Sequence, residues 1–190
     1  MKISAKAIAT IGLSLSLLLS GCTNQSSETA SGELSSVDEM FLEMMIPHHD
    51  QALEMSHLAE KNTSNPEILA LAKAIDEEQH KEIDLMSSWL GERDSHNHGH
   101  EGHTMDGMLT PEQMTALEQA KDGEFDRLFL EGMILHHEGA IEMTQMVVGS
   151  NNQEVKELAD SLIKSQTAQI EQMKQLLASL PGKRFLRHDN

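Results

Sequence analysis

A stretch of fifteen residues occurs almost twice in this chain, and this duplication constrains the fold more than any other feature. Residues 41–55 read FLEMMIPHHDQALEM, and residues 129–143 read FLEGMILHHEGAIEM. Both copies place a His-His pair between methionines at helical spacing. A second similarity joins residues 67–86 to residues 154–173. Each half of the chain therefore predicts a pair of helices, and the two halves predict an internal repeat.

The repeat predicts an all-α fold in which two helical hairpins pack into a four-helix bundle, because one hairpin cannot bury its apolar stripes alone. No segment shows the alternation of a strand, and tyrosine is absent. We expect the bundle over residues 37–182, with repeat halves at 37–91 and 123–180. A His- and Met-rich crossover at 92–110 joins the halves, and residues 183–190 form a tail.

Capping patterns predict where the helices begin and end. A helix typically starts at a Ser, Thr or Asn that is followed directly by Pro, or by an acidic or amide residue three positions later. A helix typically ends before Gly or Pro. The predicted first residues or caps are Ser36, Asn65, Thr110, about Glu124, and Asn151. The predicted last residues are about Lys61, Leu90, Val148 and Leu180, with a break near Gly123 after the short third helix.

The start of the chain predicts export. Two lysines precede an apolar run at residues 7–19, which is too short to span a bilayer but typical of a signal peptide. The run ends in Leu-Ser-Gly directly before Cys22, which resembles a bacterial lipobox. We expect residues 1–21 to be removed, Cys22 to carry a lipid anchor, and residues 22–36 to form a flexible tether. The alternative is an ordinary secretory signal.

The charge and the cysteine count restrict the partners. The chain has 14 Lys and Arg against 31 Asp and Glu, a formal charge of −17. Such a surface repels nucleic acid and anionic lipid and attracts cations. Cys22 is the only cysteine. With Cys22 lipidated, a metal would have to be held by nitrogen, thioether sulfur or oxygen.

The duplicated segment predicts a metal site in the bundle centre. On a helix, the methionines and both histidines of each copy fall on one apolar face. Burying an imidazole without a partner costs about 1–3 kcal/mol, so a metal or a hydrogen-bond network has to compensate. The alternative is core packing by methionine and histidines satisfied by hydrogen bonds. The candidate ligands are Met44, Met45, His48, His49, Met55, Met133, His136, His137 and Met143.

A second, looser metal site is predicted in the crossover. This segment has no apolar periodicity, so we expect it to be exposed and mobile, and His-rich tracts of this kind bind Cu(II), Zn or Ni with little selectivity. A solvated loop is the alternative. The candidate ligands are His96, His98, His100, His103, Met105 and Met108.

Several polar residues also face inward on the second and fourth helices. They could orient the histidines, supply an oxygen ligand, or bond to one another, and the sequence leaves these alternatives open. These residues are Glu78, Gln79, Glu82, Gln166 and Gln169.

Two Glu-x-x-His motifs raise the alternative of a di-metal oxidase, since ferritin-like bundles use such motifs to hold iron. They are Glu54 with His57 and Glu77 with His80. Both point away from the apolar faces, and neither is duplicated in the other half. We therefore expect metal binding without catalysis. No nucleophile triad and no phosphate-binding glycine loop supports a hydrolase or a nucleotide-binding protein.

The doubled motif Phe-Leu-x-x-Met-Ile-x-His-His-x-x-Ala-x-x-Met, with Gln79, Glu82, Met86 and Trp89 on the next helix, resembles the domain of unknown function 305 family. CopM-like members of that family bind copper outside the cytoplasm. The resemblance covers about residues 37–180 and implies a ferritin-like bundle and a role in copper binding and tolerance. The chain departs from the doubled motif at Gly132, where the first copy has Met44.

The chemistry of the residues favours copper independently. Thioether sulfur is soft and suits Cu(I), and imidazole suits both oxidation states. Zinc would use the histidines but gain little from the methionines. We therefore expect a protein of the cell envelope that binds copper as Cu(I), Cu(II) or both. A copper-transfer protein is an expected partner, and the sequence does not define the oligomeric state.

Overall fold

The computed structural model describes residues 33–91 and 105–181. Within these ranges the protein is all-helical and contains no strand, which confirms the predicted fold class. The helices are α1 (Ser36–Asn62), α2 (Pro66–Leu90), α3 (Pro111–Gln119), α4 (Asp122–Thr144) and α5 (Gln153–Ser179). Among the described residues, no helix has both the length and the apolar character that a membrane span requires.

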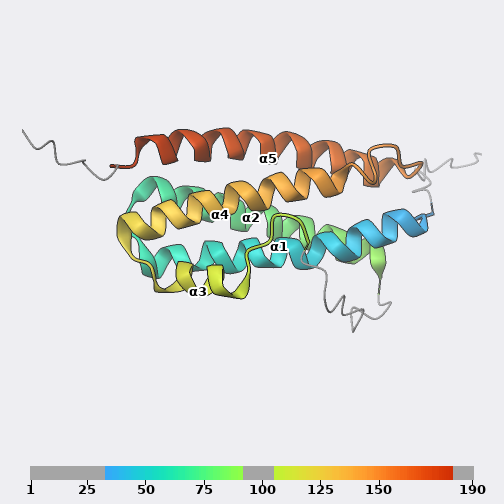
Figure 1. Cartoon of the computed structure of the whole chain (residues 1–190). Helices are drawn as coiled ribbons and strands as arrows, with labels where there is room; N and C mark the ends of the chain where they lie inside the picture. The colour runs from blue at the N-terminus through green and yellow to red at the C-terminus, as the bar shows by residue number, and fades with distance from the viewer. Residues whose placement is uncertain (1–32, 92–104, 182–190) are drawn as a thin grey trace, which may run out of the picture. The chain divides into compact units, whose positions relative to one another are not determined.

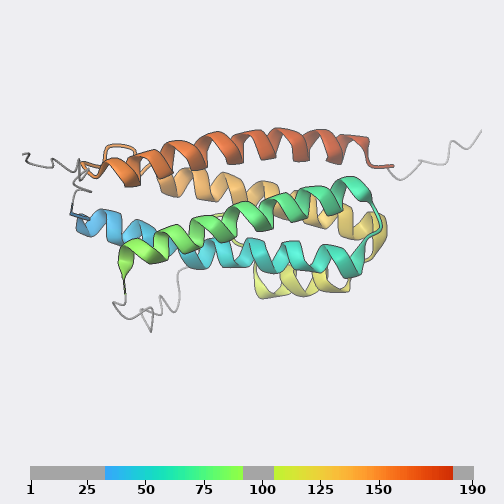
Figure 2. The ribbon, with the colours of Figure 1, turned by 180° about the vertical axis from the view of Figure 1, so that it is seen from behind.

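The four long helices run side by side as two hairpins (Figure 1). α1 packs mainly against α2, and α4 packs mainly against α5. The hairpins join chiefly through α1 and α4, the two helices that carry the His-His pairs. The short α3 packs against both α1 and α4, and the view from behind shows it beside α1 (Figure 2).

The starts of α1, α2, α3 and α5 follow the predicted caps, with shifts of at most one residue. Asn65 caps α2 and Thr110 caps α3, as predicted. The capping box of α1 was assigned one residue too late, because Ser35 and Asp38 form it instead of Ser36 and Glu39. The Asp38 carboxylate accepts hydrogen bonds from both the backbone N–H and the hydroxyl of Ser35, and these bonds make Ser35 the N-cap of α1.

The second half shows three differences. α4 begins at Asp122, two residues before the predicted start near Glu124, and it includes Gly123, where the break was predicted. α5 is capped by Asn152, whose side chain accepts from two backbone N–H groups, and not by Asn151. α4 ends at Thr144 and not at Val148. Beyond Thr144 the backbone makes i to i−3 hydrogen bonds, which tighten the chain into turns and bury Val147 against the bundle.

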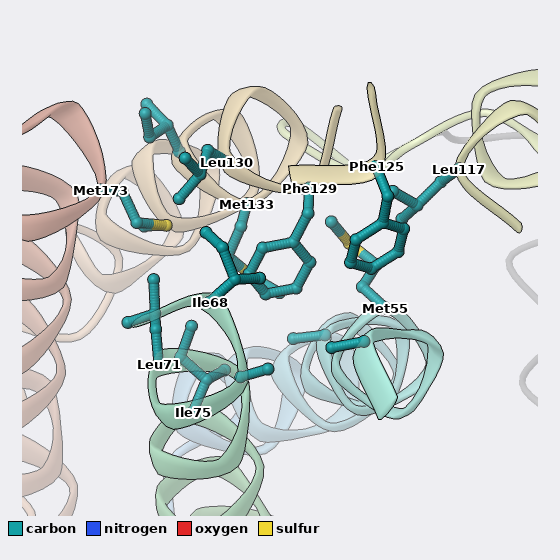
Figure 3. Close-up of a cluster of buried hydrophobic side chains, with 14 of the residues drawn as sticks. Met55, Ile68, Leu71, Ile75, Leu117, Phe125, Phe129, Leu130, Met133 and Met173 are labelled. Atoms are coloured by element: carbon teal, nitrogen blue, oxygen red, sulfur yellow. The ribbon is translucent and has the colours of Figure 1, made fainter. Parts of the chain in front are cut away.

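The apolar core consists of two clusters. The Phe125 cluster contains side chains of all five helices, and Figure 3 shows them pointing toward one another around Phe129. Phe125 and Phe129 stack with ring centroids 5.7 Å apart. The second group, the Phe41 cluster, lies toward the other end of the bundle and includes Leu42, Met45, Met86, Ala140, Met143 and Leu162.

Candidate metal centre

A polar layer, here called the histidine layer, separates the two apolar clusters, and the His-His pairs form its centre. Along α1, Phe41 and Met45 belong to one cluster, His48 and His49 follow, and Met55 belongs to the other cluster. α4 passes through the same layers in the opposite order, with Met133 before and Met143 after its histidines. All four imidazoles are completely buried. The helical repeat therefore brings them together between two apolar layers, as the sequence predicted.

The two pairs approach each other most closely through His48 and His136. Their ring centroids lie 3.8 Å apart, and the rings are inclined by 37°. The neighbours within each pair are farther apart, with centroids at 6.5 Å for His48 and His49 and at 6.2 Å for His136 and His137. Each helix thus directs one imidazole toward the partner helix and a second toward the helix of its own hairpin.

Each imidazole makes one hydrogen bond through Nε2, and every acceptor is an oxygen. His48 donates to the backbone carbonyl of Asp106 at 3.2 Å, and His136 donates to the carbonyl of His48 at 2.8 Å. His49 donates to the carboxylate of Glu82 at 2.9 Å, and His137 donates to the amide oxygen of Gln169 at 2.6 Å. These oxygens hold the proton on Nε2 and fix the tautomer.

The Nδ1 atoms of all four histidines are buried and have no hydrogen-bond partner among the described residues. With the proton on Nε2, each Nδ1 carries a free lone pair, which is the form of imidazole that binds a metal. An Nε2–H bonded to a carbonyl or carboxylate is the usual arrangement behind a histidine ligand. The side-chain amides of Gln79 and Gln166, each 2% exposed, also lie in this layer without a hydrogen-bond partner in the part of the chain that the structure describes.

The electrostatic environment keeps the imidazoles neutral at physiological pH. Burial lowers the pKa of His48, His49 and His137 to about 4, and burial with the neighbouring charge of His48 holds the pKa of His136 well below its ordinary value. Burial raises the pKa of Glu82 to about 7. The short contact of Glu82 with His49 favours an ion pair, but the burial of both groups outweighs it, so a neutral imidazole donates to the carboxylate.

The candidate thioethers border the histidine layer on both sides. Met45, Met55 and Met133 are fully buried, and Met143 is 7% exposed, whereas Met44 is only partly buried. Within the described residues, no three His, Cys, Asp or Glu side chains converge in an arrangement that could hold a metal. Any ligand set here must therefore combine imidazole with methionine sulfur or include a movement of side chains.

Residues 105–109, here called the strap, cross the bundle beside His48. Gln51 clamps the strap through two hydrogen bonds, donating to the Leu109 carbonyl at 3.0 Å and accepting from its N–H at 2.7 Å. Met105 and Met108 are half-buried and Leu109 is buried. The prediction of an exposed crossover is therefore wrong for these residues, because they pack against the helices.

Two glycines of α4 make room for the strap. A Cβ at Gly139 would overlap the Asp106 carbonyl, and Gly107, with φ +83°, lies directly against Gly139. A Cβ at Gly132 would lie 3.1 Å from Leu109 and 3.2 Å from Met55. The repeat equivalents of Gly139 and Gly132 are Gln51 and Met44. Gly132 therefore leaves the space that Leu109 fills.

The strap and the α1 residue that holds it provide functional groups that the sequence interpretation missed. These are the Asp106 carbonyl, which accepts from His48, and the Gln51 clamp. The only available signal was the pair of glycines in the second copy. His96, His98, His100, His103 and the predicted lipidation site Cys22 lie outside the described residues, so the structure does not test the roles assigned to them.

The residues of the two Glu-x-x-His motifs lie on the surface. Glu54, His57, Glu77 and His80 are all exposed. His57 contacts Asp76 at 2.8 Å on the outside of the α1–α2 hairpin. None of the four side chains belongs to the buried histidine layer. Glu78, by contrast, is half-buried and accepts a hydrogen bond from Gln169 at 2.6 Å.

Residues 38–177 match the family model described as domain of unknown function (DUF305). The chain belongs to the DUF305 family. Among curated proteins, none matches this chain. A solved DUF305 fragment from Deinococcus radiodurans has 26% identity and a TM-score of 0.70, over 76% of this chain and 97% of that one. A DUF305 protein from Streptomyces coelicolor, described as a candidate secreted protein, has 29% identity and a TM-score of 0.67, over 75% and 91%.

The solved structures similar to this chain also include CopM. CopM in the Cu(II)-bound form has 34% identity and a TM-score of 0.64, over 74% of this chain and 95% of CopM. CopM in the Cu(I)-bound form has the same identity and TM-score, over 76% and 98%. A silver-bound form of CopM, obtained by soaking, has 31% identity and a TM-score of 0.63, over 79% and 99%. These similarities confirm the resemblance inferred from the repeat.

Proposed function

We propose that this chain is an exported copper-binding protein that sequesters copper or passes it on at the cell envelope. The observation that carries the proposal is the set of four buried Nδ1 lone pairs, each on an imidazole whose Nε2 already donates to an oxygen. Neutral imidazoles oriented in this way are ready to bind a metal without losing a proton. The metal is the cargo, and the proposal includes no catalytic step.

The neighbouring sulfur atoms support copper over zinc. Buried thioethers border the histidine layer on both apolar sides, and soft sulfur ligands favour Cu(I). Zinc would use the imidazoles alone. The copper- and silver-bound forms of CopM add independent support, since silver(I) and Cu(I) are both soft monovalent ions.

The location at the envelope rests on the beginning of the chain. The apolar run at residues 7–19 and the lipobox-like sequence before Cys22 support export and a lipid anchor, and residues 22–36 would then tether the bundle to a membrane. A copper-transfer protein is the proposed partner in this compartment. The crossover residues His96, His98, His100 and His103 are proposed as a looser site that captures metal.

An anaerobic competition titration with a Cu(I) chelator tests the proposal. The wild-type protein is expected to bind Cu(I) tightly, and replacing His48, His49, His136 and His137 with alanine is expected to abolish this binding. The exposed histidines provide the matched control, so replacing His57 and His80 with alanine should leave the affinity unchanged. Unchanged affinity in the four-histidine variant would overturn the assignment.

A second variant separates ligation from folding. Leucine conserves the volume of methionine, so replacing the buried methionines should leave the helical circular dichroism spectrum unchanged. The Cu(I) affinity should still fall, because the thioethers are lost. A fully folded variant with wild-type Cu(I) affinity would contradict the role of sulfur. The replaced residues are Met45, Met55, Met133 and Met143.

A further inference from the structure

The two halves of the histidine layer differ in the group that supports the outer imidazole. Glu82 and Gln169 occupy equivalent positions of the repeat. The carboxylate of Glu82 accepts from His49, whereas the amide oxygen of Gln169 accepts from His137. Gln169 in turn donates to Glu78, so the nearest carboxylate is one hydrogen bond farther from His137. The two halves of the repeat therefore differ in charge at this position, with a carboxylate in the first half and a neutral amide in the second.

The residues next to the histidine pairs add no further charge difference. Asp50 follows His49, and its repeat equivalent Glu138 follows His137. The direct contact of the Glu82 carboxylate with His49 is therefore the charge difference between the two halves. Sulfur does not produce a comparable difference between the halves. Both have two buried thioethers, and the unmatched Met44 is only partly buried.

We propose that Glu82 makes the two histidine pairs unequal, so that the His48–His49 half prefers Cu(II) and the His136–His137 half prefers Cu(I). This inference rests on the proposed copper-binding function. Glu82 acts through His49 as a positioning residue that sets the preference for an oxidation state. A single bundle would then hold both forms of its cargo in two distinct half-sites.

The physical reason is the charge of the supporting group. A carboxylate bonded to Nε2–H makes Nδ1 a stronger donor, and loss of such a partner typically lowers metal affinity by about 10–100-fold. Its negative charge stabilises a dication more than a monocation at the same distance, because Coulomb energy is proportional to the charge of the ion. A neutral amide orients the ring equally well but adds no charge. The α4 half therefore retains orientation and sulfur, which suit Cu(I).

Glu82→Gln tests the inference because it removes the charge and keeps the shape. We expect the Cu(II) affinity of the purified chain to fall about tenfold and its Cu(I) affinity to change less than about threefold. The tenfold change corresponds to a rise of about 59 mV in the reduction potential of the bound copper. Glu43→Gln removes the same charge from an exposed position of α1 and is the matched control, with no expected change.

The reciprocal variant moves the carboxylate to the other half. Glu78→Gln with Gln169→Glu, introduced into the Glu82→Gln protein, should restore Cu(II) binding and its electron paramagnetic resonance signal with nitrogen hyperfine coupling. A merely structural role for Glu82 would not allow this rescue. The paired change avoids placing two carboxylates at the contact between residues 78 and 169.

The outcomes separate this inference from the proposed function. Wild-type protein that binds neither Cu(I) nor Cu(II) would refute both. Wild-type protein that binds copper, together with a Glu82→Gln variant that loses both forms equally or loses neither, would overturn the inference and leave the proposed function in place. A selective loss of Cu(II) with an increased reduction potential supports the inference.

Discussion

Replacing Gly139 with alanine tests how tightly the strap is built into the bundle. In an ordinary exposed helix this change is favourable, because alanine exceeds glycine in helix propensity by about 1 kcal/mol. Here the added Cβ would overlap the Asp106 carbonyl, which is held between α4 and the imidazole of His48. The atoms nearest to this Cβ belong to the backbone of Asp106 and Gly107, so the strap itself has to move.

The expected loss follows from what the strap contributes. Moving it weakens three hydrogen bonds, one from His48 and two with Gln51, at about 1 kcal/mol each. It also exposes part of Leu109, whose full burial is worth about 1.5–3 kcal/mol. After subtraction of the gain in helix propensity, we expect Gly139→Ala to lower the free energy of unfolding by about 2–4 kcal/mol.

Urea denaturation of the metal-free protein measures this loss, and limited proteolysis reports whether the strap is released. Gly123→Ala is the matched control, because, apart from its neighbours along the chain, no atom of residues 33–91 or 105–181 lies within 4 Å of a Cβ at that position of α4. The control should be neutral or up to about 1 kcal/mol more stable. If Gly139→Ala were as stable as this control, the close contact between the strap and α4 would not exist in solution.

Two further predictions concern the same region. Gln51→Leu removes both hydrogen bonds to Leu109 and should lower the free energy of unfolding by about 1–3 kcal/mol and speed proteolytic cleavage in the strap, whereas uncleaved strap at wild-type stability would contradict the clamp. The metal-free protein should also lose stability as the pH falls from 6.5 toward 4, because the lowered pKa values of the buried histidines mean that the unfolded chain binds more protons in this window. Glu82, whose pKa is raised, acts in the opposite direction between pH 7 and 4.5, but it is one group against four. Urea titrations at pH 7.5 and 5.0 would refute this sign if they gave equal free energies of unfolding.

The helices and the histidine layer could be predicted from the sequence because they depend on local and periodic signals. Helical spacing placed both His-His pairs on apolar faces, and the repeat required those faces to meet. The small errors at Ser35 and Asn152 arose where two adjacent residues could both cap a helix. The two adjacent residues differ only in whether their side chain reaches the backbone N–H groups of the first helical turn, and tertiary packing decides this.

The strap could not be predicted in the same way. Its contacts are made by backbone carbonyls, and it fits against α4 because Gly132 and Gly139 have no side chain. No periodicity of the sequence marks such contacts. The sequence did show that these two glycines interrupt the repeat. The sequence interpretation took Gly132 as the loss of a thioether and assigned no meaning to Gly139, whereas the structure relates both glycines to one segment that crosses α4.

The unpartnered polar groups of the histidine layer lower the stability of the fold, and a bound metal ion would reduce this cost. Of the buried side-chain nitrogen and oxygen atoms that lack a hydrogen bond in the described residues, most belong to this layer, namely the four Nδ1 atoms and the amides of Gln79 and Gln166. Each such group costs about 1–3 kcal/mol, and the total is comparable with the net stability of about 5–15 kcal/mol typical of a whole domain. A cation that binds the lone pairs relieves part of this cost only in the folded state. At a thousandfold excess over its dissociation constant, such an ion would stabilise the fold by about 4 kcal/mol, so the metal-free bundle is expected to be the less stable and more adaptable form.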